Sequence, residues 1–343
     1  MPDFPYINAR VRAMRSRLLS AAQLEDLLGT PTMAAFLQAL ASTPYGGDLQ
    51  EALVRYEGLR AVDEALARNF QRATQAILRF AEGRPHALIE IVLLRWDLEN
   101  LRAIVRGRHA SRPAEEVIQA LLPAGTLREV VLKEMAGYPD MTGLAGTLEA
   151  VGHPLAAALA KGVAEYVETK DLTALELHLD RAYAERGLQQ IGRRGRDAAV
   201  LREMLESEID VANAKTALKL ASAGNLSKAE RLRYFIPGGP LFSAERFVDL
   251  ASPETQAPAA ARLRARGLPI PDLPADLIAF EQEMDLKVAR GMASAYLGDP
   301  LGVDIIIGYV AMKSAEVTNL RLIARGKFLG LPREQVRREM ILV

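Results

Sequence analysis

The chain has 343 residues, of which 50% are hydrophobic and 25% charged, and its 43 basic and 43 acidic side chains cancel. This length suits about two average domains or several smaller units, and the mixture of apolar and charged residues is not that of a disordered tail. The absence of cysteine excludes disulfides, zinc–cysteine sites and iron–sulfur clusters, and the zero net charge excludes an overall basic field that would attract nucleic acid.

The residue types favour helices over strands, because Ala, Leu, Arg, Glu and Gln dominate and aromatic residues make up only 6%. The helical period is clearest in segment 87–108, where apolar residues recur at steps of three and four: Leu88, Ile91, Leu94, Leu98, Leu101 and Val105. In chain order, we expect helices at residues 10–28, 32–42, 59–81, 87–108, 114–122, 126–136, 172–190, 197–222, 227–235, 242–250, 275–297, 301–328 and 332–341. The sequence therefore predicts an all-α protein.

Proline and glycine interrupt the helical pattern at four places, since they remove a backbone donor or permit a positive φ. We expect loops or tight turns at residues 42–48, 136–143 and 236–240, and the longest irregular segment at 251–274. No part of the sequence is typical of a strand-rich domain.

A short pattern recurs along the chain, in which Asn is followed by Ala or Leu and then by a base. Its four copies begin at Asn8, Asn100, Asn213 and Asn319, and their bases are Arg10, Arg102, Lys215 and Arg321. In the last three copies an acid stands three residues before the asparagine, at Asp97, Asp210 and Glu316. Segments farther along also match, as residues 112–117 do with 331–336. The pattern predicts three related helical units, 1–93, 94–206 and 207–298, and a C-terminal piece, 299–343, that restarts the pattern and closes onto the first unit.

An acid and an asparagine three residues apart lie on one face of a helix, where the asparagine can bond a neighbouring helix or loop. The base two residues later points elsewhere, and we expect it to meet solvent or a partner. The simplest interpretation is that these residues hold each unit together. A ligand site repeated in each unit is the alternative.

A search for catalytic and ligand-binding motifs finds none of the usual patterns. The histidines are His86, His109, His153 and His178, and none of them forms an HExxH motif or an i to i+4 pair that would bind zinc. Gly326 and Lys327 form the chain's single Gly-Lys dipeptide, but they lack the rest of a phosphate-binding loop. We therefore expect no catalytic residue, no metal, no cofactor, no small-molecule substrate and no nucleic-acid partner.

No segment is expected to enter a membrane. The N-terminal segment carries arginines where the apolar part of a signal peptide should follow. The most apolar runs, 87–96 and 303–312, are interrupted by Glu90, Arg95 and Asp304, whereas a crossing helix needs about 20 consecutive apolar residues. We expect a soluble protein that meets a membrane through another protein or a surface patch.

Three segments resemble a known family. YINARVRAM at 6–14, VLLRWDLENLRAIVRGR at 92–108 and the long block at 299–340 are similar to the subunit of V-type and archaeal-type rotary ATPases that is known as C in prokaryotes and d in eukaryotes. The resemblance implies an all-helical, funnel-shaped protein of three similar domains around a pseudo-threefold axis. It also implies a non-catalytic adaptor on the cytoplasmic face of the membrane, which joins the central rotor stalk to the proteolipid ring and carries no nucleotide site.

Two other functions remain open at this point. One is a general helical repeat scaffold that binds another soluble protein, and the other is a helical enzyme that uses scattered carboxylates and histidines. For the adaptor we expect Arg10, Arg102, Lys215 and Arg321 to be exposed and to shape the partner surfaces by matching charge, which favours specificity more than affinity.

Overall fold

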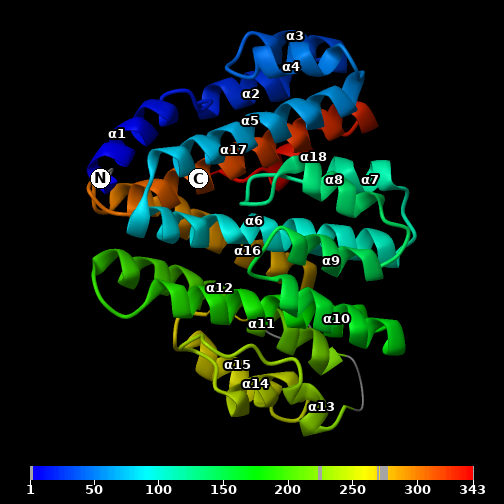
Figure 1. Ribbon diagram of the computed structural model, residues 1–343, viewed down its shortest axis with the longest axis vertical. Helices are drawn as coiled ribbons and strands as arrows, with labels where there is room; N and C mark the ends of the chain where they lie inside the picture. Colours follow the sequence, from blue (N-terminus) through cyan, green and yellow to red (C-terminus); the bar gives the residue numbers. More distant parts are fainter. Residues whose placement is uncertain (1–2, 223–225, 269, 271–276, 343) are drawn as a thin grey trace. The chain divides into compact units, whose positions relative to one another are not determined.

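The computed structural model describes residues 3–222, 226–268, 270 and 277–342. These residues form helices joined by loops, with no β-strand among them, so the all-α prediction is confirmed for this part of the chain (Figure 1). The chain divides into two compact units: Met1–Gly143 together with Ala289–Val343, and Leu144–Val288. Within the described ranges, no helix combines the length and the apolar character needed to span a bilayer.

The first unit combines the two ends of the chain. Its helices are α1 (Phe4–Arg15), α2 (Ala21–Gly29), α3 (Met33–Ala41), α4 (Gly46–Leu53), α5 (Gly58–Phe80), α6 (Gly83–His109), α7 (Ala114–Ala120), α8 (Glu129–Gly137), η1 (Ala295–Leu297), α17 (Asp304–Leu329) and α18 (Arg333–Glu339).

Helix α17 is the centre of this unit, because it packs against α5, α1, α2 and α3 although these helices lie at the other end of the sequence (Figure 1). It is buried over most of its length, with Ile306, Val310 and Leu320 fully buried and with several buried polar side chains among the apolar ones. The N-terminal helices contribute Ile7 and Phe70 to the same core. The two ends of the chain are therefore parts of one folded unit.

The second unit contains α10 (Ala156–Thr169), α11 (Leu172–Ile191), α12 (Arg196–Ser222), α13 (Lys228–Leu232), α14 (Ala244–Ala251) and α15 (Gln256–Arg264). Helices α9 (Thr142–Ala150) and α16 (Leu277–Ser294) begin or end near its limits. Its core is formed by buried residues of α12, α14 and α15, among them Leu218, Phe247, Leu250 and Leu263.

The structure corrects the predicted N-terminal helix. Residues 10–28 were expected to form one helix, but α1 ends at Arg15 and α2 starts at Ala21. The break is stabilised by a capping box, in which the Ser20 hydroxyl accepts from the Gln23 N–H while the Gln23 side chain accepts from the Ser20 N–H. This local arrangement outweighs the apolar periodicity that continues across the break.

Two expected loops contain helices. Residues 42–48 include the start of α4 at Gly46, where a β-carbon would overlap the carbonyl oxygen of Ala41, so glycine here permits close packing rather than ending a helix. Residues 251–274 include α15, whose Pro258 lies in the first turn, where its missing N–H has no partner to lose. Residues 271–274 of that segment and the predicted helix start at 275 lie outside the described residues.

Candidate functional site

At three places in the chain, an asparagine clamp joins a long helix to the segment that follows the next, shorter helix. In the first, the Asn100 amide nitrogen donates to the Leu122 carbonyl oxygen at 2.6 Å, and the Leu122 N–H donates to the Asn100 amide oxygen at 2.8 Å. One planar amide supplies both a donor and an acceptor, so asparagine satisfies both polar groups of the facing residue. The same reciprocal bonds, 2.7 to 2.9 Å long, join Asn213 to Ile236 and Asn319 to Ile341.

A carboxylate one helical turn earlier strengthens the first two clamps. Asp97 accepts from the backbone N–H of Thr126 at 2.8 Å and from that of Leu127 at 3.0 Å. In the second clamp, Asp210 accepts from the Leu241 N–H at 3.1 Å. Burial raises the pKa of Asp210 to about 6, although its backbone hydrogen bonds oppose that rise. The acid and the asparagine therefore fix two points of one loop to one face of a helix.

Glycine makes this close approach possible. A β-carbon at Gly125 would overlap a carboxylate oxygen of Asp97, and one at Gly239 would overlap a carboxylate oxygen of Asp210. The two loops match because each must bring its backbone against a buried carboxylate, and a side chain at these positions would block it.

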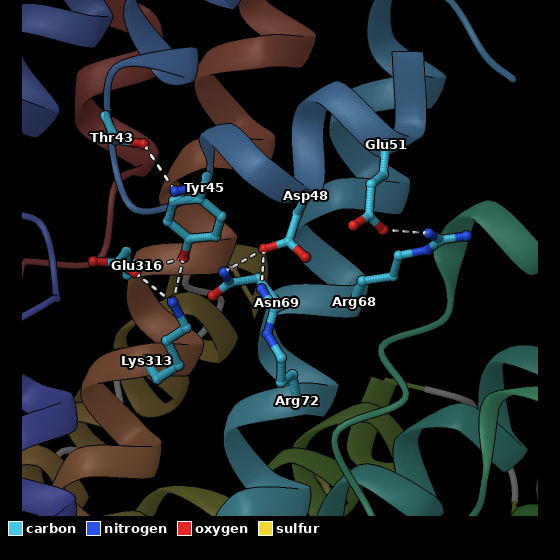
Figure 2. A network of polar contacts seen from close by, with 9 residues as sticks. All are labelled: Thr43, Tyr45, Asp48, Glu51, Arg68, Asn69, Arg72, Lys313 and Glu316. Carbon is cyan, nitrogen blue, oxygen red and sulfur yellow. Dashed lines mark hydrogen bonds and ion pairs between the residues drawn. The ribbon is translucent and has the colours of Figure 1, made fainter. Parts of the chain in front are cut away.

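The third copy carries glutamate, which contacts the N-terminal segment instead of a later loop (Figure 2). The Glu316 carboxylate accepts from the Tyr45 hydroxyl at 2.5 Å, from the Lys313 ammonium at 2.8 Å and from the Leu19 N–H. Lys313 also donates to the Tyr45 hydroxyl at 2.7 Å. Each of Tyr45, Lys313 and Glu316 is at most 5% exposed. A side chain one methylene longer than aspartate thus ties α17 to the segment between α1 and α4.

Burial governs the protonation of this cluster. It lowers the pKa of Lys313, and the neighbouring Glu316 carboxylate opposes that change. It raises the pKa of Tyr45, and the Glu316 charge raises it further. The tyrosine therefore remains a hydrogen-bond donor at neutral pH, and the charged pair is stabilised by mutual contact instead of by water.

A second group of polar side chains lies beside this cluster and joins α4 to α5 (Figure 2). The buried Asp48 carboxylate accepts from the Asn69 amide at 2.7 Å and from the Arg72 guanidinium. On the surface nearby, Arg68 donates to Glu51 at 3.4 Å. These bonds fix the two helices to each other.

The structure places the predicted site residues in different environments. Arg10 is exposed, and its guanidinium lies 4.6 Å from the centre of the Phe80 ring. Arg102 and Lys215 are half-buried and pair with Glu99 and Asp285 respectively.

Arg321 is buried, so the expectation that it is exposed was wrong. Its side chain is 8% exposed, lies 3.2 Å from a carboxylate oxygen of Asp63 and donates to the Leu121 carbonyl oxygen at 3.0 Å. Burial lowers the pKa of Arg321 to about 10 and raises that of Asp63. The pattern places this base two residues after Asn319, but at this position the helix is covered by α5 and by the loop after α7.

Asn8 is buried as well, but it forms no asparagine clamp. Its amide nitrogen donates to the carbonyl oxygens of Pro300 and Gly302, at 3.1 and 2.8 Å. It therefore joins α1 to the loop that precedes α17. Tyr45, Lys313 and Asp63 were not predicted as part of a site, and the sequence carries one signal for them, since Lys313 precedes Glu316 by a helical turn.

Among the described residues, no group of three or more His, Asp or Glu side chains is placed to hold a metal ion. The carboxylates of the first two clamps accept from backbone donors, and the buried cations Lys313 and Arg321 contact buried acids. Arranged in this way, the polar groups of the recurring pattern hold helices and loops together.

Comparison with known proteins identifies relatives along nearly the whole chain. The chain matches the family described as ATP synthase (C/AC39) subunit over residues 7–339. It is 35% identical to a Deinococcus radiodurans protein named as the C subunit of a V-type ATP synthase, over 99% of this chain and 92% of that protein. A Thermus thermophilus protein of the same name is also 35% identical, over 99% and 98% of the two chains. The C subunit of the A-type ATP synthase of Haloferax volcanii is 30% identical, over 98% and 97%.

Proposed function

Because the chain belongs to the ATP synthase (C/AC39) subunit family, we propose that it is the non-catalytic adaptor of a V/A-type rotary ATPase, joining the central rotor stalk to the proteolipid ring. In this role it lies on the cytoplasmic side of the membrane and meets the lipid through the complex. It takes part in ATP-driven ion transport or in ATP synthesis without binding nucleotide. The observation that carries the proposal is the family match over residues 7–339.

An adaptor that transmits torque must resist deformation, and the polar contacts described above serve that need. Close-packed helices are stiff, but a loop between helices is the weakest part of such a structure. Each asparagine clamp fixes its loop with two hydrogen bonds, and Asp97 and Asp210 add a second attachment point in two of them. The cluster around Glu316 does the same for the N-terminal segment.

The clamp recurs in 94–206, 207–298 and 299–343, which supports the proposal of three similar domains, 1–93, 94–206 and 207–298, arranged about a pseudo-threefold axis as a funnel, with 299–343 closing onto the first and supplying its clamp. Three similar contacts around an axis suit a ring, and the differences between the copies suit an asymmetric stalk. We further propose that Arg10, Arg102 and Lys215 shape the partner surfaces, since these three side chains retain access to solvent.

Purification through an affinity tag on this chain tests the proposal. The tagged chain is expected to bring down central-stalk subunits and the proteolipid from detergent-solubilised membranes, with the stalk retained after the membrane sector is washed away. The matched control is the same tag on an unrelated helical protein of the same cell. Recovery of the chain with neither partner would contradict the adaptor role and favour a scaffold for another soluble protein.

A further inference from the structure

A groove in the first unit is lined by four cations. It has a volume of about 570 Å³, and the cations are Arg10, Arg17, Arg72 and Lys313. None of the described residues that line it is acidic. Glu316 binds Lys313 and Asp48 binds Arg72, but both carboxylates lie outside the groove. The local charge is therefore positive although the whole chain is neutral.

The two walls of the groove are single faces of two helices. One wall, formed by α1 and the turn after it, presents Arg10, Ala13, Met14 and Arg17, which recur at steps of three and four. The other wall runs along α5 from Asn69 to Phe80 with the same steps. At 1.5 Å per residue, this wall is about 16 Å long, or three helical turns. The lining of the groove therefore extends along about three turns of one face of α5.

Small and apolar side chains make up much of the lining of the groove. Ala13, Ala73 and Ala76 lie there, and such small side chains let another backbone approach closely. Met14 and Phe80 add apolar surface to the lining. An inorganic anion would gain nothing from covering this surface, whereas the apolar face of a helix would.

The rim cations are available to a ligand. Arg10 is held over the Phe80 ring, and within the described part of the chain neither Arg10 nor Arg17 forms an ion pair with an acid. Both are exposed. Two exposed cations without acidic partners on one wall, facing Arg72 on the other, form a charge pattern that an acidic helix would complement.

We propose that this groove receives an amphipathic helix of a partner protein, with small and apolar residues against Ala73 and Ala76 and with Asp or Glu on its flanks beside Arg10, Arg17 and Arg72. The groove length sets the contact at about three turns of the partner helix. This inference rests on the shape and charge of the groove and does not depend on the adaptor role.

The probe that tests it is a synthetic, fluorescein-labelled helix of about 16 residues, or four to five turns, with Leu and Ala on one face and Glu on both flanks. Fluorescence anisotropy with the full-length chain is expected to show saturable binding that weakens as salt rises. The double variant Arg10→Glu/Arg17→Glu should bind at least about tenfold more weakly. The matched control is Arg12→Glu/Arg79→Glu, which changes net charge equally at two exposed positions outside the groove and should bind like the unchanged chain.

A second variant separates shape from charge and covers the case in which the charge reversal fails to fold. Ala73→Trp places a large side chain in the groove without altering charge, and it is expected to abolish binding while its circular dichroism remains that of the unchanged chain. Three results would overturn the proposal. The two double variants could weaken binding equally, a probe with Lys flanks could bind as well as the probe with Glu flanks, or inorganic pyrophosphate could bind while the helix does not.

Discussion

The substitution Asn100→Ala tests whether the asparagine clamp holds the structure together. It removes two hydrogen bonds, of 2.6 and 2.8 Å, and leaves the N–H of the half-buried Leu122 without a partner, whereas the Leu122 carbonyl still accepts from the Ala124 N–H at 2.7 Å. The loss of two bonds at about 1 kcal/mol each, with about 1 kcal/mol for the stranded N–H, exceeds the gain of about 0.5 kcal/mol from a better helix former. We expect the free energy of unfolding to fall by about 2 to 3 kcal/mol.

The chain contains one tryptophan, which makes the assay specific. Trp96 lies on the same helix as Asn100, is 7% exposed, and packs edge-on against Phe70 with 5.7 Å between ring centres. Its fluorescence during urea denaturation therefore reports the unfolding of the first unit. The matched control is Arg102→Ala, whose side chain is 20% exposed and pairs with an exposed glutamate, and it should cost less than about 1 kcal/mol. Equal midpoints and slopes for the two variants would refute the clamp.

Three further predictions concern the remaining contacts. Gly239→Ala should destabilise the second unit by about 2 kcal/mol or more, because the new methyl group separates the loop from Asp210. Calorimetry should show a lower melting temperature for this variant than for Gly137→Ala, where the added methyl group has free space. Lys313→Met should lower the free energy of unfolding by about 3 to 5 kcal/mol, because it strands the Glu316 charge. The double variant Lys313→Met/Glu316→Gln should recover part of that loss. A double variant no more stable than the single one would contradict the pairing. The folded chain holds a proton on Asp210 up to about pH 6, whereas the unfolded chain releases it near pH 4. The stability of the unchanged chain relative to Asp210→Asn should therefore rise as pH falls from about 7 to 5. A difference between their urea midpoints that does not change over this range would count against it.

Sequence periodicity predicts the long helices well because each buries a stripe whose period is local. The expected helix at 301–328 corresponds to α17 and that at 59–81 to α5, each within a few residues. It fails where a local cap outweighs the apolar stripe, as at Ser20, and where close packing selects glycine, as at Gly46. Helix α10 was not predicted, although its Ala-rich sequence favours a helix.

The clamp residues could be found from the sequence because the pattern recurs, but their partners could not. The contact of Asn100 with Leu122 closes a segment that contains the end of α6 and all of α7, and the path of that segment depends on packing. The burial of Arg321 depends on Asp63, which is far away in the sequence and is brought close by the fold. The cationic groove was not predicted for the same reason, since its walls come from separate segments.

The most direct test of the adaptor role is the coupling between ATP hydrolysis and ion movement in membrane vesicles. Vesicles that lack this chain are expected to lose ATP-driven ion transport completely, while the detached soluble sector still hydrolyses ATP, and addition of the purified chain should restore transport. Two results would contradict the account: full ion transport by vesicles that lack the chain, or a detached soluble sector that no longer hydrolyses ATP when the chain is absent.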